Sequence, residues 1–128
     1  MRYVAEHPVE IEGDNPSTIA SLKSIQIQFY LNLALVQLKA ENYGDAIKTA
    51  SRVLELSPLA DADKAKAYYR RGMAYGKTRE EDLAVTDLKS ASELNPGDKA
   101  IERELRETRE RVKSRKDKER KAFAKMFS

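Results

Sequence analysis

The chain has 128 residues, 41% hydrophobic and 35% charged, which is enough for one packed domain and too polar for a membrane protein. No stretch approaches the roughly 18 consecutive apolar residues of a membrane span, and the start of the chain lacks the apolar core of a secretory signal. The absence of cysteine excludes disulfides and thiolate metal sites and fits a location in the cytoplasm or nucleus, and the net charge of +3 selects no single class of partner.

The start of the chain, over residues 1–17, is predicted to be the end of an incomplete repeat followed by a polar loop. Residues 1–7 are expected to form the last turns of a helix, and residues 8–16 lie between two prolines. A repeat unit buries its apolar face only against its neighbours, so two complete units make a thin core. We therefore expect the chain to be a piece of a longer protein, with a natural short protein as the alternative.

An internal repeat occupies the middle of the chain, where the sequence matches itself at a constant offset. The aligned pairs include Tyr30 and Tyr68, Ala34 and Gly72, Lys39 and Lys77, Ala46 and Ala84, Glu55 and Glu93, and Pro58 and Pro96. Apolar residues within each copy follow a helical period, which predicts one helical hairpin over residues 18–58 and another over residues 59–97. The expected helices cover residues 19–39, 45–56, 63–77 and 81–94, with an insertion around residues 59–62.

A long basic helix is predicted at the C-terminal end, over residues 98–128. Residues 99–128 hold 12 Lys and Arg against 6 Asp and Glu. Asp98 is a plausible N-cap, and Ile101, Leu105 and Val112 have the spacing to cover the open edge of the second hairpin. No apolar residue occurs from 113 to 121, so this part should project from the body and end in an apolar group at Phe123 and its neighbours Met126 and Phe127.

Both copies resemble the tetratricopeptide repeat, a family of helical hairpins with a period of about 34 residues. The residues that carry this resemblance are Tyr30, Ala34, Tyr43, Ala46, Val53 and Pro58, and then Tyr68, Gly72, Tyr75, Ala84, Leu88, Ala91 and Pro96. Gln37 and Glu81 depart from it, because both positions are usually apolar. The resemblance implies an all-α right-handed superhelix of hairpins, here with a long C-terminal capping helix.

The repeat register also brings candidate binding residues together. Asn32 aligns with Arg70, and Gln28 with Lys66, so these side chains should converge on the concave surface that the first helices of the hairpins line. Lys66 and Arg70 are like charges four residues apart, which is locally unfavourable and suggests that a bound anion supplies the missing charge. Arg, Lys and an Asn amide together suit a carboxylate. Further along this face are four possible peripheral contacts, Leu35, Lys39, Met73 and Lys77, for which simple solvation and helix packing are an equal alternative.

The segments 66–72, 87–89 and 118–128 are similar to the C-terminal domain of the forty-kilodalton cyclophilins, with the large FK506-binding immunophilins next. This resemblance implies a co-chaperone module that holds the C-terminal Glu-Glu-Val-Asp peptide of heat shock protein 90 or its seventy-kilodalton relative. Asn32, Lys66 and Arg70 match three positions of the family's carboxylate clamp. The isomerase domain of these proteins has no counterpart in the sequence, so the chain is predicted not to be an enzyme.

Other partners follow from the basic helix and from the first repeat helix. The basic helix with its terminal Phe residues is also typical of calmodulin-target or membrane-surface segments, with a solvated extension of the capping helix as the alternative. Its interleaved acidic residues argue against nucleic acid. Apolar residues on more than one face of residues 19–39 predict an exposed edge and a homodimer formed through it. No catalytic set, phosphate loop or metal-ligand spacing occurs, so neither a metal nor another cofactor is expected.

Overall fold

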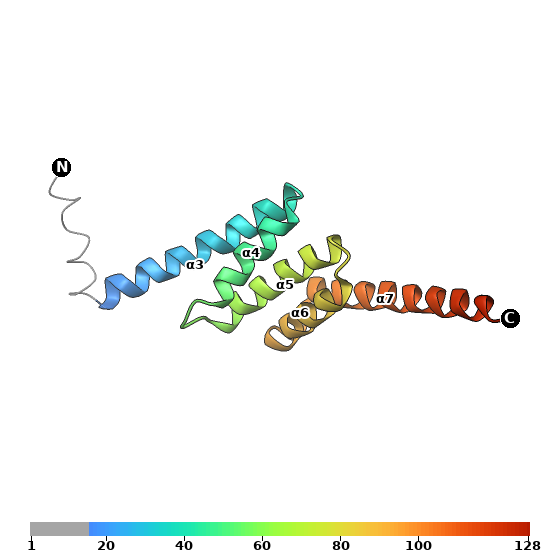
Figure 1. The fold of residues 1–128 in the computed structure, drawn as a ribbon. Coiled ribbons are helices and arrows are strands. Elements are labelled where there is room, and N and C mark those ends of the chain that lie inside the picture. Colours follow the sequence, from blue (N-terminus) through green and yellow to red (C-terminus); the bar gives the residue numbers. More distant parts are fainter. Residues whose placement is uncertain (1–15) are drawn as a thin grey trace.

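The computed structural model describes residues 16–128, which form five helices and no strand. The helices are α3 (Pro16–Lys39), α4 (Tyr43–Leu54), α5 (Asp61–Lys77), α6 (Glu81–Leu94) and α7 (Lys99–Met126). Each helix packs on the next, and the pairs α3–α4 and α5–α6 are antiparallel hairpins (Figure 1). The predicted all-α hairpin fold is confirmed for this part of the chain. The helix expected over residues 1–7 lies outside the described residues.

Four of the eight predicted helix ends in the two hairpins differ from the observed ones by two or three residues, and both ends of α6 agree. α3 begins at Pro16, because proline has no N–H to lose in the first turn of a helix. α5 begins at Asp61, so residues 61 and 62 belong to this helix and not to the expected insertion. The first turn of α5 carries Asp61 and Asp63, whose negative charge is favourable at a helix N-terminus.

The two hairpin turns repeat each other in backbone geometry. Glu41 and Arg79, which occupy equivalent positions of the two copies, both adopt positive φ angles of 63° and 66°. The residue after each donates its backbone N–H to the carbonyl five residues before it, at 2.8 Å in the first hairpin and 2.9 Å in the second. The repeat found in the sequence is therefore also a repeat in structure.

Small residues allow the paired helices to approach closely, as predicted. Ala34, Ala46 and Ala84 are fully buried. At Gly72 the approach leaves no room for a side chain, since a Cβ placed there would lie 3.0 Å from the Cγ of Leu88. Side chains at these positions are limited to a methyl group or less, which fixes the distance between the two helices of each hairpin.

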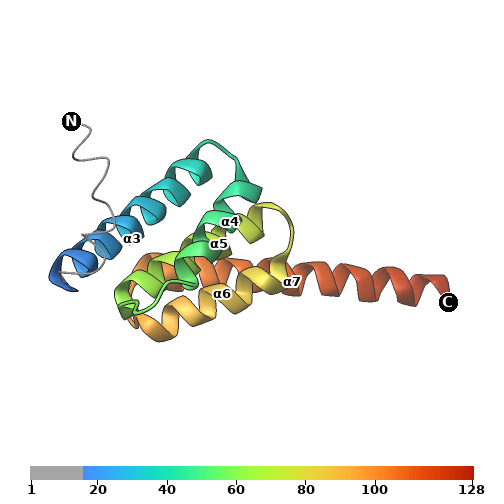
Figure 2. The same cartoon turned by 60° about the vertical axis from the view of Figure 1, so that its left-hand side comes forward.

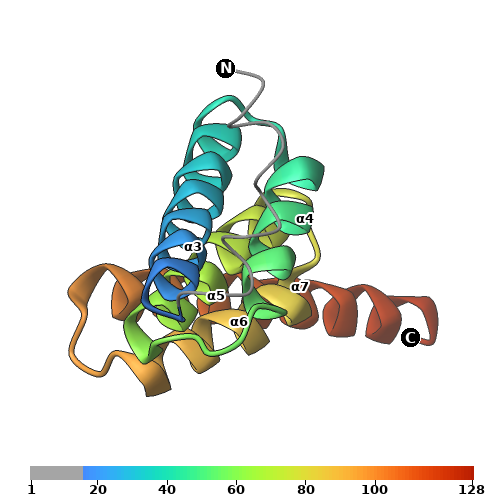
Figure 3. The same ribbon diagram turned by 90° about the vertical axis from the view of Figure 1, so that its left-hand side faces the viewer.

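Larger apolar side chains fill the space where the two hairpins meet. Ile27 and Leu31 of α3, Val53 of α4 and Ala67 of α5 form one buried cluster. α3 thus contacts both its hairpin partner and the first helix of the second hairpin, and Figure 3 shows α3 beside α4 with α5 next to them. This packing sets the relation between α3 and α5, the two helices that carry the predicted binding residues.

The other face of α3 is open. Ile25, Phe29 and Val36 are 65%, 59% and 60% exposed. Among residues 16–128, α3 is the one helix long and apolar enough to cross a membrane by length and composition, which corrects the expectation that no stretch comes close. Part of its apolar character serves the packing of the hairpin, and the rest lies on the open face. The homodimer expected through this face stays a prediction.

α7 begins as predicted and covers the second hairpin. The Asp98 carboxylate accepts hydrogen bonds from the backbone N–H groups of Ala100 and Ile101, at 3.0 and 3.1 Å. Ile101, Leu105 and Thr108 are buried against the body, mainly against α6. Beyond them the helix projects to the C-terminus (Figure 2).

The projecting part is mostly exposed, so it is expected to contribute little to stability apart from one contact. Arg115 reaches back to Glu81 of α6 at 2.8 Å, a contact that the sequence did not predict. Deleting residues 113–128 should remove this ion pair, whose Arg115 and Glu81 side chains are 39% and 15% exposed, and lower the free energy of unfolding by about 1 kcal/mol. Leu105→Ala, by contrast, should cost about 2–5 kcal/mol, since Leu105 is 6% exposed. Thermal melts of both variants test this, and a larger loss on deletion than on Leu105→Ala would contradict it.

Candidate functional site

A groove of about 360 Å³ lies between α3 and α5. Its lining residues are Leu35, Leu38 and Lys39 of α3, Tyr43 of α4, and Lys66, Tyr69, Arg70, Met73 and Lys77 of α5. Both helices are the first helices of their hairpins, so the groove is on the face that the repeat register predicted to be a binding surface. We call it the peptide groove.

Six of the eight predicted site residues line the peptide groove. The two that do not are Gln28 and Asn32, which lie on exposed positions of α3. Gln28 is engaged elsewhere, because its amide Nε2 donates to Asp63 Oδ1 at 3.1 Å. Asn32 makes no side-chain hydrogen bond within residues 16–128, so its amide is available to a ligand that extends beyond the groove.

The charges in the peptide groove are of one sign. Lys39, Lys66, Arg70 and Lys77 line it, and none of the other lining residues is acidic. The remaining lining side chains are those of two leucines, two tyrosines and Met73. A groove with cations and an apolar floor suits a ligand that combines carboxylates with apolar side chains.

Arg70 is held in place by the neighbouring helix. Its Nη1 donates to the backbone carbonyl oxygen of Leu31 at 2.6 Å, across 39 positions in the sequence. Burial lowers the pKa of Arg70 from its ordinary value, although a guanidinium remains charged in proteins. The contact fixes the position of the guanidinium, and its other N–H donors make no hydrogen bond within residues 16–128, so they are available to an anion. It also ties α5 to α3, so Arg70 has a structural role in addition to the predicted one.

The adjacent Arg71 has a different task, which the sequence analysis missed. Its Nε and Nη2 donate to the two carboxylate oxygens of Asp87 at 2.7 and 2.8 Å, and its Nη1 donates to Ser51 Oγ at 3.1 Å. The guanidinium also lies over the rings of Tyr68 and Tyr75. Its hydrogen bond with Asp87 raises the pKa of Arg71. This side chain joins α4, α5 and α6 and faces away from the peptide groove.

Gln37 and Glu81, which stand at positions that are usually apolar in the family, both have polar partners. The Gln37 side-chain oxygen accepts a hydrogen bond from Thr49 at 2.7 Å. Glu81 accepts one from Arg115 at 2.8 Å and lies 3.7 Å from Arg111. Each polar replacement is thus satisfied by a second polar residue on the helix it faces.

No group of three or more His, Asp or Glu side chains within residues 16–128 could hold a metal ion. The tetratricopeptide repeat family model matches residues 27–58 and 65–98, which include most of the two observed hairpins and begin within α3 and α5. The chain belongs to the tetratricopeptide repeat family.

Full-length relatives carry this segment as a part. Peptidyl-prolyl cis-trans isomerase CYP7 of Saccharomyces cerevisiae is 36% identical over 128 residues, covering 100% of this chain and 32% of that protein. Peptidyl-prolyl cis-trans isomerase D of Kluyveromyces lactis is 37% identical over 86% of this chain and 30% of its own length. The same-named protein of Cryptococcus neoformans is 36% identical over 99% of the chain and 35% of its length.

The predicted relationship to cyclophilin-type isomerases is confirmed by these matches. The chain spans about a third of the length of the curated relatives that it matches. The matched third is formed by tetratricopeptide hairpins and the helix after them, which are a repeat fold and not an isomerase domain. The segment is a protein-interaction module and not the catalytic part of such proteins.

Proposed function

We propose that this chain is a co-chaperone module that binds the acidic C-terminal Glu-Glu-Val-Asp peptide of heat shock protein 90 or its seventy-kilodalton relative in the cytoplasm. The observation that carries the proposal is the peptide groove, with four cations and no acidic side chain among its lining residues. Kinship with the cyclophilin-type isomerases supports it, because the resemblance noted in the sequence implies this partner.

In the proposed complex, Lys66 and Arg70 hold the terminal carboxylate. Lys66 is an exposed, mobile point charge, whereas Arg70 is oriented by its bond to Leu31. The Asn32 amide donates to the peptide from the edge of the groove. Aliphatic peptide side chains pack on the apolar floor, near Met73. The arrangement supplies charge-assisted hydrogen bonds to a carboxylate and an apolar surface for the residue before it.

Lys66→Ala is expected to weaken binding of the free Glu-Glu-Val-Asp peptide by about 1.5–3 kcal/mol, the value of a hydrogen bond to a charged group. Arg70→Ala should weaken it at least as much and should also lower the melting temperature, because the tie to Leu31 is lost. Isothermal titration with a thermal melt of each variant separates the two effects. Unchanged affinity in both variants would refute the groove assignment.

Two controls make the test specific to the groove and to the carboxylate. Lys89→Ala removes the same charge from an exposed position on α6 outside the groove and should leave affinity unchanged. Amidating the peptide's C-terminus should remove most of the binding to the unmodified chain, and higher salt should weaken it. Equal binding of the acid and the amide would mean that another basic surface is the site.

A second candidate function rests on the end of α7. Phe123 and Phe127 are 63% and 74% exposed, and their ring centroids lie 4.8 Å apart on a basic helix. Such a helix has the form of a calmodulin target, with aromatic anchors on a cationic stem. Loss of calmodulin binding on deletion of residues 113–128, with peptide binding retained, would support this function as separate from the groove.

A further inference from the structure

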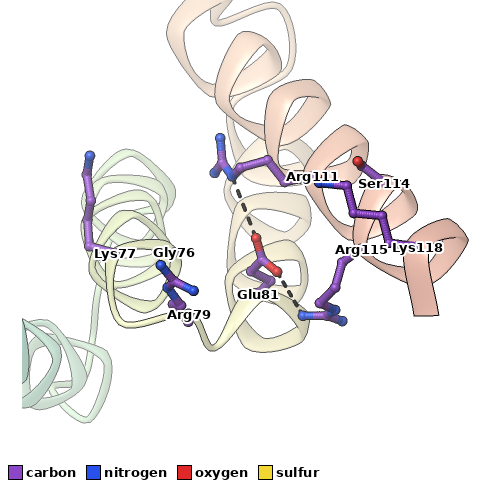
Figure 4. A pocket seen from close by; sticks show the side chains of 8 residues that line it. All are labelled: Gly76, Lys77, Arg79, Glu81, Arg111, Ser114, Arg115 and Lys118. Atoms are coloured by element: carbon purple, nitrogen blue, oxygen red, sulfur yellow. Dashed lines mark hydrogen bonds and ion pairs between the residues drawn. The ribbon is translucent and has the colours of Figure 1, made fainter. Parts of the chain in front are cut away.

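A second, larger cleft lies where the turn between α5 and α6 faces α7. Its volume is about 660 Å³. It is lined by Gly76, Lys77, Arg79, Glu81, Arg111, Ser114, Arg115 and Lys118. Figure 4 shows Glu81 between the two arginines of α7, with Lys77 and Arg79 on the opposite wall. We call this feature the basic cleft.

Five of the eight residues that line the basic cleft are cations and one is an anion. Glu81 pairs with Arg115 at 2.8 Å and with Arg111 at 3.7 Å, which fixes both arginines against the body. Lys77, Arg79 and Lys118 form no ion pair within residues 16–128. The cleft therefore keeps a surplus of positive charge after its internal pairs are formed.

The basic cleft and the peptide groove adjoin at Lys77, which lines both. From Lys66 to Lys77 is 11 positions along α5, or about 16 Å at the rise of an α-helix. An extended peptide covers that distance in about five residues. Consider a peptide that binds its terminal carboxylate at Lys66 and runs along α5. The residues that reach the basic cleft are those about five or more positions before its C-terminal residue.

We infer that the basic cleft is a second anionic subsite, which takes acidic side chains upstream of the partner's terminal motif. The inference rests on the proposed function, since the terminal carboxylate sets the register of the peptide. A peptide fits better than nucleic acid, because no aromatic side chain lines the cleft to stack on a base.

Three peptides of equal length test the inference by isothermal titration at low and high salt. All end in Glu-Glu-Val-Asp; one has Gly and Ser upstream, one has Asp and Glu at the positions five to eight from the C-terminus, and one is the acidic peptide with an amidated end. The acidic peptide should bind the chain about fivefold more tightly than the neutral one at low salt, from two or more exposed ion pairs. This advantage should shrink as salt rises.

Matched variants locate the effect. Arg79→Gln combined with Lys118→Gln should abolish the acidic peptide's advantage and leave affinity for the neutral peptide unchanged. Lys116→Gln combined with Lys125→Gln makes the same change of charge on positions outside the cleft lining and should retain the advantage. Equal affinity for the acidic and neutral peptides, or an advantage that survives in the Arg79/Lys118 variant, overturns the inference.

The remaining outcomes separate this inference from the proposed function. If the neutral peptide does not bind and the amidated acidic peptide binds as well as the free acid, the terminal clamp is wrong, and a two-part site is wrong with it. If the neutral peptide binds in a carboxylate-dependent manner without an acidic advantage, the proposed function stands and the second subsite does not. Tighter binding of single-stranded DNA than of the acidic peptide, lost in the Arg79/Lys118 variant, would assign the cleft to nucleic acid instead.

Discussion

Asp87→Ala is expected to lower the free energy of unfolding by about 3 kcal/mol, the lower end of the cost of removing one partner from a buried ion pair. The Asp87 side chain is 4% exposed and that of Arg71 is 22% exposed. After the substitution, the Arg71 guanidinium would remain between Tyr68 and Tyr75 with only Ser51 as a hydrogen-bond acceptor. Urea unfolding of the variant measures the loss. Glu93→Ala, which removes an acidic residue outside this pair on the same helix, is the control and should change stability little.

The other copy of the repeat supplies a rescue variant. Leu33 and Thr49 occupy the positions of the first copy that correspond to Arg71 and Asp87 in the second. A double variant, Arg71→Leu with Asp87→Thr, copies that pair and removes both charges together. Replacing a whole buried ion pair by residues of similar volume is often neutral, so the double variant should recover most of the stability lost in Asp87→Ala. An equal or greater loss in the double variant would show that the pair is not the source of the effect.

The same comparison shows what the sequence could and could not predict. Ala46 and Ala84 are small residues at the same position of the helical period in the two copies. Such agreement predicted the close helix packing, because it can be recognised from each helix alone. The pair of Arg71 and Asp87 is a difference between the copies, and its two members lie on different helices. One signal could have revealed the ion pair. In the second copy, a cation and an anion both replace residues that are uncharged in the first copy, at positions of the repeat that contact each other.

The residues of the candidate site were predicted only in part, because the repeat register gives equivalent positions on two helices but not how the helices are placed against each other. The helical period places Asn32 and Arg70 at equivalent positions, but it does not give the offset between α3 and α5. That offset depends on how Ile27 and Leu31 pack between the hairpins. The groove therefore includes residues toward the end of α3, such as Lys39, and leaves Asn32 outside its lining. The hydrogen bond from Arg70 is accepted by a backbone carbonyl, a group that every residue has. No sequence pattern therefore indicates which residue accepts it.

Gly72→Leu is expected to destabilise the chain by about 3 kcal/mol, the upper end of the usual cost of overpacking. Even a Cβ at this position would lie 3.0 Å from Leu88 Cγ, 3.2 Å from Asp87 Cβ and 3.3 Å from the backbone oxygen of Ala84. A leucine cannot fit unless α5 and α6 separate, and the separation would also disturb the carboxylate of Asp87. At Gly44 a Cβ would meet nothing within 4 Å, so Gly44→Leu is the matched control and should be neutral or slightly stabilising.

A double-mutant cycle with Leu88→Ala tests whether the close approach is the cause. Leu88 is fully buried, so its truncation alone should cost about 2–5 kcal/mol. In the Gly72→Leu background the same truncation removes the atom that the new side chain meets and opens space for it. The cost of the double variant should therefore be smaller than the sum of the single costs, by more than the roughly 0.5 kcal/mol seen for independent sites. Additive costs would mean that the close contact with Leu88 is not what limits the side chain at residue 72, and that Gly72 is required for another reason.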